Sequence, residues 1–237
     1  MSLFLEKVVD DGYTYYNITH AGYALVVVLG ILLLGLVSYF INADGKFKMS
    51  IKQLTVSALC LALAFVLSNL KLFKLPMGGS VTVFSMFFVC FIGYLYGPRV
   101  SLSAAFAYGL LQLVVDPYII SIPQLLCDYV LAFTALGLSG FFYNKKNGLI
   151  KGYLLGIFGR FVFSTLSGIL FFSEYTPDGM TPLGYSAAYN GSYIAVEGLI
   201  TVILVAIPAV NEALSTIKRE ANEKDLRVPI SEEKKTA

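Results

Sequence analysis

The chain has 237 residues, of which 57% are hydrophobic and only 14% are charged, and its formal net charge is +2. Together with a mean hydropathy of +0.74, this composition excludes an ordinary soluble domain and predicts a membrane protein. A net charge this small also argues against a nucleic-acid-binding protein.

The N-terminal part of the chain predicts one membrane span of its own. The first twenty residues are polar, and they lack the basic start and the cleavage site of a signal peptide. The apolar run at about 21–41 that follows is long enough to cross a bilayer. We therefore expect residues 1–48 to form an N-terminal extension with an extra transmembrane helix.

Six further spans are predicted after a lysine-containing link. They lie at residues 53–70, 81–96, 101–115, 122–142, 151–172 and 191–213. The fold class expected is an all-α integral membrane protein, in which a six-helix bundle at 49–215 follows the extra helix and makes seven spans in all. A polar, lysine-rich tail at 216–237 is expected to be helical only at its start.

The distribution of Lys and Arg predicts the orientation of these spans. One side would hold the six basic residues of the tail together with Lys46, Lys48, Lys52, Arg99, Lys145, Lys146 and Lys151, whereas the other would hold only Lys7, Lys71 and Lys74. This places the C-terminus in the cytoplasm and the N-terminus outside. The loops at 71–80, 116–121 and 173–190 then share the outer face, and Gly78-Gly79 is expected to be the hinge of a lid.

Asp128 is the main candidate for a binding residue. If its helix begins near Ile122, the carboxylate lies about 9 Å along the axis, beneath the outer loops. A charge at such a depth costs roughly 2.5–3.5 kcal/mol on insertion, which makes a functional role the default interpretation. With Tyr118 and Tyr129 nearby, the pattern suits an organic cation held among aromatic rings. A structural role as the partner of Arg160 is the alternative.

The other charges within the spans are Arg160 and Glu197, which either form a mutual ion pair or contact a ligand. Catalytic and nucleotide-binding motifs are missing, and the cysteines do not have the spacing of metal ligands, so we expect no enzyme, no metal and no cofactor. Asn190 supplies both a donor and an acceptor for a heteroaromatic ring. Ala58 and Ala62 share a helix face, suited either to packing within the bundle or to docking another subunit.

Several motifs resemble one known family over residues 52–213. They are Pro76-Met-Gly-Gly-Ser-Val-Thr82, Asp116-Pro-Tyr118, Gln124-Leu-Leu-Cys-Asp-Tyr129 and the run from Gly184 to Tyr193. The sequence is similar to the thiamine-specific S components of energy-coupling-factor (ECF) transporters, of the ThiT/YuaJ type. The resemblance implies a substrate-binding subunit in the bacterial cell membrane that captures thiamine from outside. It also implies partners, namely a transmembrane coupling subunit and two cytoplasmic ATPase subunits.

The resemblance also implies roles for single residues. Asp128 would face the thiazolium cation, and Ala58 with Ala62 would dock the coupling subunit. The remaining substrate-binding positions would be Tyr118, Tyr129, Tyr185, Asn190, Ser164, Phe172 and Gly79. Three of these depart from the family pattern, because Ser164 stands where relatives often carry histidine, and Phe172 and Gly79 where some carry tryptophan.

Two other functions remain open on the sequence. The first is an S component for another small cationic or heteroaromatic vitamin, with the same fold and a different pocket. The second is a proton-coupled thiamine carrier that acts alone, with Asp128 or Glu197 as the proton relay.

Overall fold

The computed structural model describes residues 5–10, 13–19, 21, 49–114 and 117–223. The extra helix predicted at about 21–41 therefore lies almost wholly outside the described residues, as does the end of the tail. Within the described part, a hairpin of β1 (Leu5–Asp10) and β2 (Tyr13–Ile18) precedes the helices. The helices that follow are α2 (Ile51–Ser68), α3 (Ser85–Tyr96), α4 (Pro98–Gln112), α5 (Ile122–Leu125), α6 (Ala132–Thr134), α7 (Gly148–Phe171), α8 (Pro182–Ala206) and α9 (Pro208–Asn222).

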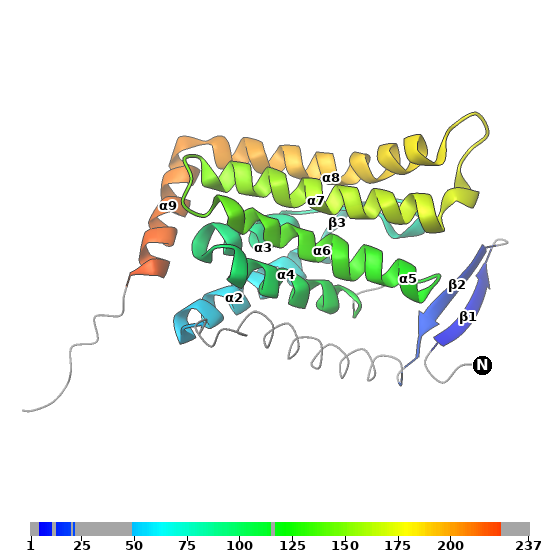
Figure 1. Cartoon of the computed structure of the whole chain (residues 1–237), viewed down its shortest axis with the longest axis horizontal. Helices are drawn as coiled ribbons and strands as arrows, with labels where there is room; N and C mark the ends of the chain where they lie inside the picture. The colour runs from blue at the N-terminus through cyan, green and yellow to red at the C-terminus, as the bar shows by residue number, and fades with distance from the viewer. Residues whose placement is uncertain (1–4, 11–12, 20, 22–48, 115–116, 224–237) are drawn as a thin grey trace, which may run out of the picture.

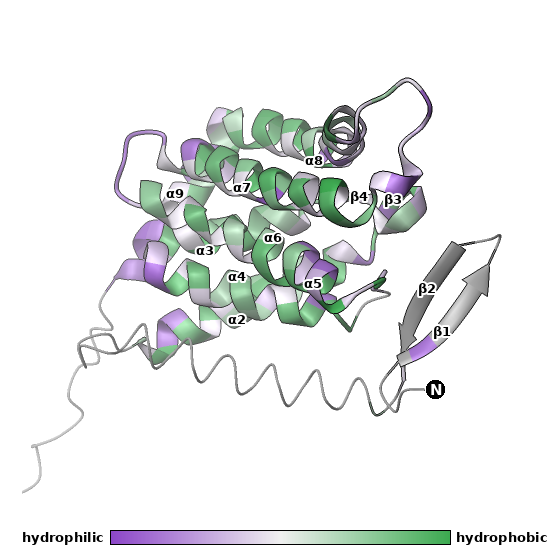
Figure 2. Ribbon diagram, turned by 45° about the vertical axis from the view of Figure 1, so that its right-hand side comes forward, coloured by the Kyte–Doolittle hydropathy of each residue, from purple (hydrophilic) through white to green (hydrophobic). Residues whose placement is uncertain are grey.

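Helices run side by side through most of the molecule, with α9 at one end and α5 at the other (Figure 1). Figure 2 shows that hydrophobic residues dominate along these helices. Their boundaries follow local chemistry: Ser50 forms a capping box with Gln53 at the start of α2, and a proline begins each of α4, α8 and α9. The prediction of a mostly helical protein is confirmed.

Four helical segments within the described residues are long and apolar enough to cross a membrane. They are α2, residues Ile122–Phe142, α7 and α8. Helix α3 is apolar but shorter, and α4 has 15 residues. The structure thus supports an integral membrane protein, while seven spans remain a prediction.

The segment Ile122–Phe142 is a continuous but irregular helix. After α5, its chain widens into a π-helical stretch, Leu126–Leu131, and after α6 it tightens into a 3₁₀ stretch, Ala135–Phe142. Asp128 and Tyr129 lie in the π-helical stretch. Such stretches are rare and occur often at functional sites, because the extra residue in the turn redirects the side chains around it.

The loop expected at 71–80 is more ordered than predicted. Strand β3 (Lys71–Lys74) pairs antiparallel with β4 (Ser80–Thr82), with a short 3₁₀ turn at Pro76–Gly78 between them. Because β4 takes up residues 80–82, helix α3 begins at Ser85 and not at residue 81 as predicted.

Helix α8 also differs from the prediction, since it begins at Pro182 and not at residue 191. Thr181 accepts a hydrogen bond from the Gly184 N–H, which caps the helix within the predicted loop. The helix ends at Ala206 because Pro208 lacks the N–H needed to continue it. The polar residues that follow form α9, so the start of the predicted tail is a defined helix.

Helix α3 is the most enclosed helix of the described bundle. Its residues Val89, Ile92 and Leu95 have no exposed surface. Close approach of the 3₁₀ stretch is possible because Gly93 meets Ser139 and Gly140, where a Cβ would come within 2.2 Å of the Ser139 hydroxyl oxygen. The pocket described next lies beyond the N-terminal end of this buried helix.

Candidate functional site

A pocket of about 140 Å³ lies between the β3–β4 hairpin, the Ile122–Phe142 helix, α7 and α8. Its lining includes every substrate-binding candidate from the sequence, which are Gly79, Tyr118, Asp128, Tyr129, Ser164, Phe172, Tyr185 and Asn190. Described residues of the segments 71–80, 116–121 and 173–190 thus line one pocket with Asp128, although those of the third segment lie in α8 and not in the predicted loop.

The carboxylate of Asp128 is held on one side only. Gln124 Nε2 and Ser167 Oγ both donate to Oδ2, at 2.6 and 2.8 Å. Its other oxygen, Oδ1, accepts no hydrogen bond from the described residues. Because Asp128 lines the pocket, this second oxygen is available to a bound cation.

Gln124 and Ser167 support Asp128 but were not selected from the sequence. Gln124 has 1% of its surface exposed and also links Asp128 to the neighbouring loop, by donating to the Tyr118 carbonyl at 3.2 Å. Its position four residues before Asp128 on the same helix was a usable signal, since residues at this spacing face each other. Ser167 comes from α7, and no local pattern links it to Asp128.

Aromatic rings form the walls on either side of the mouth. The Tyr118 and Phe172 ring centroids are 6.0 Å apart, and the Tyr118 N–H donates to the Tyr129 hydroxyl at 2.8 Å. Phe172 thus contributes an aromatic face to the wall.

Three tyrosines at helical spacing line the wall formed by α8. The ring centroids of Tyr185 and Tyr189 are 6.2 Å apart, and those of Tyr189 and Tyr193 are 6.0 Å apart. Residues four apart share one face of a helix, so these rings descend into the pocket as a ladder. Tyr193 has 8% of its surface exposed, and its hydroxyl donates to Asn190 Oδ1 at 2.7 Å.

Tyr189 fastens the β3–β4 hairpin over the pocket. Its hydroxyl donates to the Pro76 carbonyl and accepts from the Gly79 N–H at 2.9 Å. A Cβ at Gly79 would lie 2.5 Å from this hydroxyl oxygen, so the close approach requires glycine there. The space that a larger residue at this position would need is filled by the Tyr189 ring.

Within the protein, Asn190 makes more hydrogen bonds than the sequence suggested. Its amide nitrogen donates to the carbonyls of Ser164 and Ser186, at 3.2 and 2.9 Å. With Oδ1 accepting from Tyr193, the side chain keeps spare acceptor capacity only. Of the donor and the acceptor that the sequence attributes to Asn190, the donor is thus used within the protein, and its contact with a ligand stays a prediction.

The mutual ion pair considered for Arg160 and Glu197 is not present. Arg160 forms no ion pair with Glu197 or with Asp128, the two carboxylates considered as its partners. Glu197 instead accepts hydrogen bonds from Thr82 Oγ1 at 2.6 Å and the Met86 N–H at 3.0 Å. It anchors the end of β4 and the start of α3 beneath the pocket.

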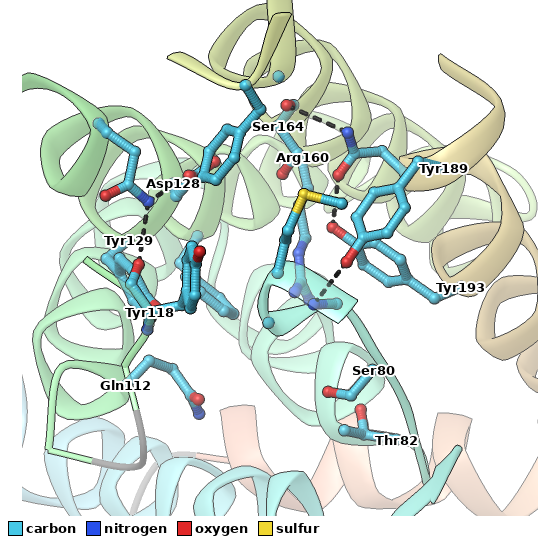
Figure 3. Close-up of a pocket in the computed structure, with 18 of the residues that line it drawn as sticks. Ser80, Thr82, Gln112, Tyr118, Asp128, Tyr129, Arg160, Ser164, Tyr189 and Tyr193 are labelled. Atoms are coloured by element: carbon cyan, nitrogen blue, oxygen red, sulfur yellow. Dashed lines mark hydrogen bonds between the residues drawn. The ribbon is translucent and has the colours of Figure 1, made fainter. Parts of the chain in front are cut away.

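Arg160 lies at the centre of the pocket, between the Asp128 side and the tyrosine ladder (Figure 3). Its guanidinium carbon is 4.3 Å from the centroid of the Phe133 ring and 6.0 Å from that of Tyr193. The guanidinium is therefore held by aromatic contacts and not by a carboxylate.

Ala58 and Ala62 lie on the exposed face of α2, whereas Ser57, Cys60 and Ala64 on the same helix are buried. The two alanines therefore do not serve packing inside the described bundle. Among the described residues, no group of His, Cys, Asp and Glu side chains could hold a metal ion.

Known thiamine transporters are similar to this chain in sequence and in structure. The chain is 28% identical to the thiamine transporter ThiT of Bacillus subtilis over 148 residues, which are 56% of this chain and 77% of that protein. It is 22% identical over 121 residues to ThiT of Lacticaseibacillus paracasei, covering 44% of this chain and 60% of that protein. The solved structure of ThiT from Listeria monocytogenes superposes with a TM-score of 0.54 at 26% identity, over 66% of this chain and 94% of that one.

The model of the thiamine transporter protein family (Thia_YuaJ) matches residues 54–216, from α2 into α9. The match covers every segment that lines the pocket and begins after the N-terminal extension. These relatives are transporters and not enzymes, in agreement with the lack of catalytic motifs. The chain therefore belongs to the thiamine transporter protein family.

Proposed function

We propose that the protein is the substrate-binding membrane subunit, or S component, of an ECF-type transporter and captures thiamine from outside for ATP-driven uptake. The observation that carries this proposal is the Asp128 carboxylate, which has one oxygen free of hydrogen bonds from the described residues in a pocket walled by aromatic rings. Thiamine combines a permanent thiazolium cation with a flat heteroaromatic ring, and the two features of the pocket match these two features of the ligand.

In this proposal the thiazolium ring lies against Asp128 Oδ1, and Tyr118, Tyr129, Tyr185 and Phe172 flank the two rings. Gly79 lines the mouth of the pocket with its backbone, whose N–H donates to the Tyr189 hydroxyl. Ser164 and Asn190 line the inner wall, where Asn190 has an acceptor to offer. Since the Asp128 carboxylate is already oriented by Gln124 and Ser167, binding would need little rearrangement at this end.

The pocket is proposed to open to the outside and α9 to face the cytoplasm. Supporting this, Lys52, Lys145, Lys146 and Lys218 lie near the end of the bundle at which α9 contacts the chain. Cytoplasmic ends of membrane proteins are enriched in such residues.

Docking onto the transmembrane coupling subunit is proposed to use the exposed face of α2 around Ala58 and Ala62. Small residues four apart allow close approach of a partner helix, and both side chains are exposed. The partner complex would then supply the ATPase subunits, because the family match covers a membrane domain only.

Uptake by reconstituted vesicles tests the proposal. Vesicles that hold the chain alone should bind thiamine but should accumulate none when a proton gradient is applied. Vesicles that also hold the coupling subunit and both ATPases should accumulate thiamine when ATP is supplied. Asp128→Asn is the matched negative control. Gradient-driven accumulation by the chain alone would instead establish a self-sufficient carrier. The hydrogen bonds on Glu197 favour an anchoring role over the proton relay that such a carrier requires.

A further inference from the structure

Arg160 is an uncommon feature for the interior of a membrane protein, because its donors have no acceptor among the residues that the structure describes. The guanidinium has five N–H donors. None of them makes a hydrogen bond with the described residues, and the Nε atom is fully buried without a partner. Leaving buried donors unpaired is costly, so a group other than the described chain is expected to use them.

Arg160 contacts aromatic rings in a way that uses none of its N–H donors. The guanidinium carbon lies 4.3 Å above the centroid of the Phe133 ring, with Tyr193 farther away at 6.0 Å. A cation–π contact satisfies the charge of a guanidinium without a hydrogen-bond acceptor. Since Arg160 lines the pocket, between Asp128 and the α8 tyrosines, its unused donors are beside the space where a ligand would lie (Figure 3).

Three of the other side chains with donors on the inner wall already use them within the protein. Gln124 donates to Asp128 and the Tyr118 carbonyl, Asn190 donates to the Ser164 and Ser186 carbonyls, and Tyr193 donates to Asn190. Arg160, with its five N–H donors, therefore offers a ligand more donors than any of these three side chains.

We propose that Arg160 is a specificity-determining residue, which donates hydrogen bonds to an acceptor on the neutral heteroaromatic ring of a cation held at Asp128. This inference rests on the proposed function and names the part of the ligand that is recognised. For thiamine, the acceptor is a ring nitrogen of the aminopyrimidine. In this arrangement Asp128 binds the cationic ring, and Arg160 selects ligands whose neutral ring carries a hydrogen-bond acceptor.

A double-mutant cycle between protein and ligand tests this inference. The ligands are thiamine and an analogue in which a phenyl ring replaces the aminopyrimidine and the thiazolium is kept. Arg160→Met keeps much of the length of the side chain and removes its donors. The matched control is Lys151→Met, at an exposed residue of the same helix. We expect Arg160→Met to weaken thiamine binding at least tenfold, about 1.4 kcal/mol, and the analogue by less than about twofold.

Equal losses for both ligands, or no loss for either, would overturn the role of Arg160 in reading the ring. Absence of thiamine binding by the native chain would instead overturn the proposed function itself, so the two failures are distinguishable.

A measurement on the native chain covers the case in which Arg160→Met does not fold. With nitrogen-labelled arginine, the Nε–H resonance of Arg160 can be assigned by its absence in Arg160→Lys and followed during titration. Thiamine should shift this resonance strongly, and the phenyl analogue should leave it near its ligand-free position. Identical shifts with both ligands would contradict a hydrogen bond to the aminopyrimidine.

Discussion

The two oxygens of the Asp128 carboxylate have different surroundings, and this difference makes the residue suited to bind a cation. Oδ2 accepts hydrogen bonds from Gln124 and Ser167, whereas Oδ1 accepts none from the described residues. The position of Asp128 at the pocket was predictable, because a carboxylate within an apolar span has few structural uses. Its orientation was not predictable, since Ser167 meets it only through the packing of α7 on the π-helical turn.

Tyr189 is a second single residue with a testable role, because it is expected to control how fast a ligand enters and leaves the pocket. The Tyr189→Phe substitution removes the hydroxyl that bridges the Pro76 carbonyl and the Gly79 N–H. A hydrogen bond contributes roughly 0.5–1.5 kcal/mol, so the closed hairpin should lose about 1 kcal/mol or more. Stopped-flow measurements should show thiamine association and dissociation both accelerated, dissociation by about fivefold.

The matched control is Tyr94→Phe, which removes the hydroxyl of a ring that Lys218 contacts at the α9 end of the bundle. Its binding rates should equal those of the native chain. Unchanged rates in Tyr189→Phe would show that the β3–β4 hairpin is not the lid, and equal association rates with the hairpin locked by a cross-link would lead to the same conclusion.

Among the elements, the long regular helices were predictable and the irregular ones were not. The apolar runs that became α2 and α7 were placed within a few residues. By contrast, a π-helical turn leaves the hydropathy of Ile122–Phe142 unchanged, so no pattern in composition reveals it. The start of α8 was missed because Pro182 and the polar residues after it look like a loop, although Thr181 and Pro182 form an ordinary helix start.

Packing between α3 and the 3₁₀ stretch should depend on the absence of a side chain at Gly93. In Gly93→Ala, the new Cβ would lie 2.2 Å from Ser139 Oγ and 2.6 Å from the Gly140 nitrogen. Because two backbones must separate, the free energy of unfolding should fall by about 1–3 kcal/mol. Thermal unfolding in detergent should show a clearly lowered midpoint.

The comparison variant is Gly191→Ala in α8, where the nearest atom would lie 3.6 Å away, at ordinary contact distance. Alanine in a helix interior is favoured over glycine by about 0.5–1 kcal/mol, so this variant should be as stable as the native chain or more so. Equal destabilisation by both substitutions would contradict the close packing described for Gly93.

On the scale of the whole molecule, α9 joins three parts of the bundle at the end opposite α5 (Figure 1). Lys52 at the start of α2 donates to the Glu220 and Glu223 carbonyls, at 2.6 and 3.1 Å. Asn222 donates to the Leu95 carbonyl at 2.9 Å, and Lys218 donates to the Tyr143 carbonyl. The sequence shows only a polar tail here, because the partners of these side chains lie far away along the chain.

A chain that ends at Ile207 should therefore lose stability without losing its pocket. Removing α9 leaves the Leu95 and Tyr143 carbonyls without these donors and uncovers the apolar contacts of Leu214 and Ala221. The unfolding midpoint should fall, whereas thiamine affinity should stay within about twofold, since distant sites contribute independently. A large loss of affinity in folded, truncated protein would show that the two ends are coupled.

Calorimetric titration of the purified native chain beside Asp128→Asn tests most directly whether thiamine binds here with its cation against Asp128. Asparagine keeps the shape of the side chain and removes its charge. We expect tight one-to-one binding by the native chain and an affinity at least tenfold lower in the variant, about 1.4 kcal/mol. Equal affinity in the two proteins would rule out the cation site at Asp128, and a folded native chain that binds no thiamine would rule out the proposed function.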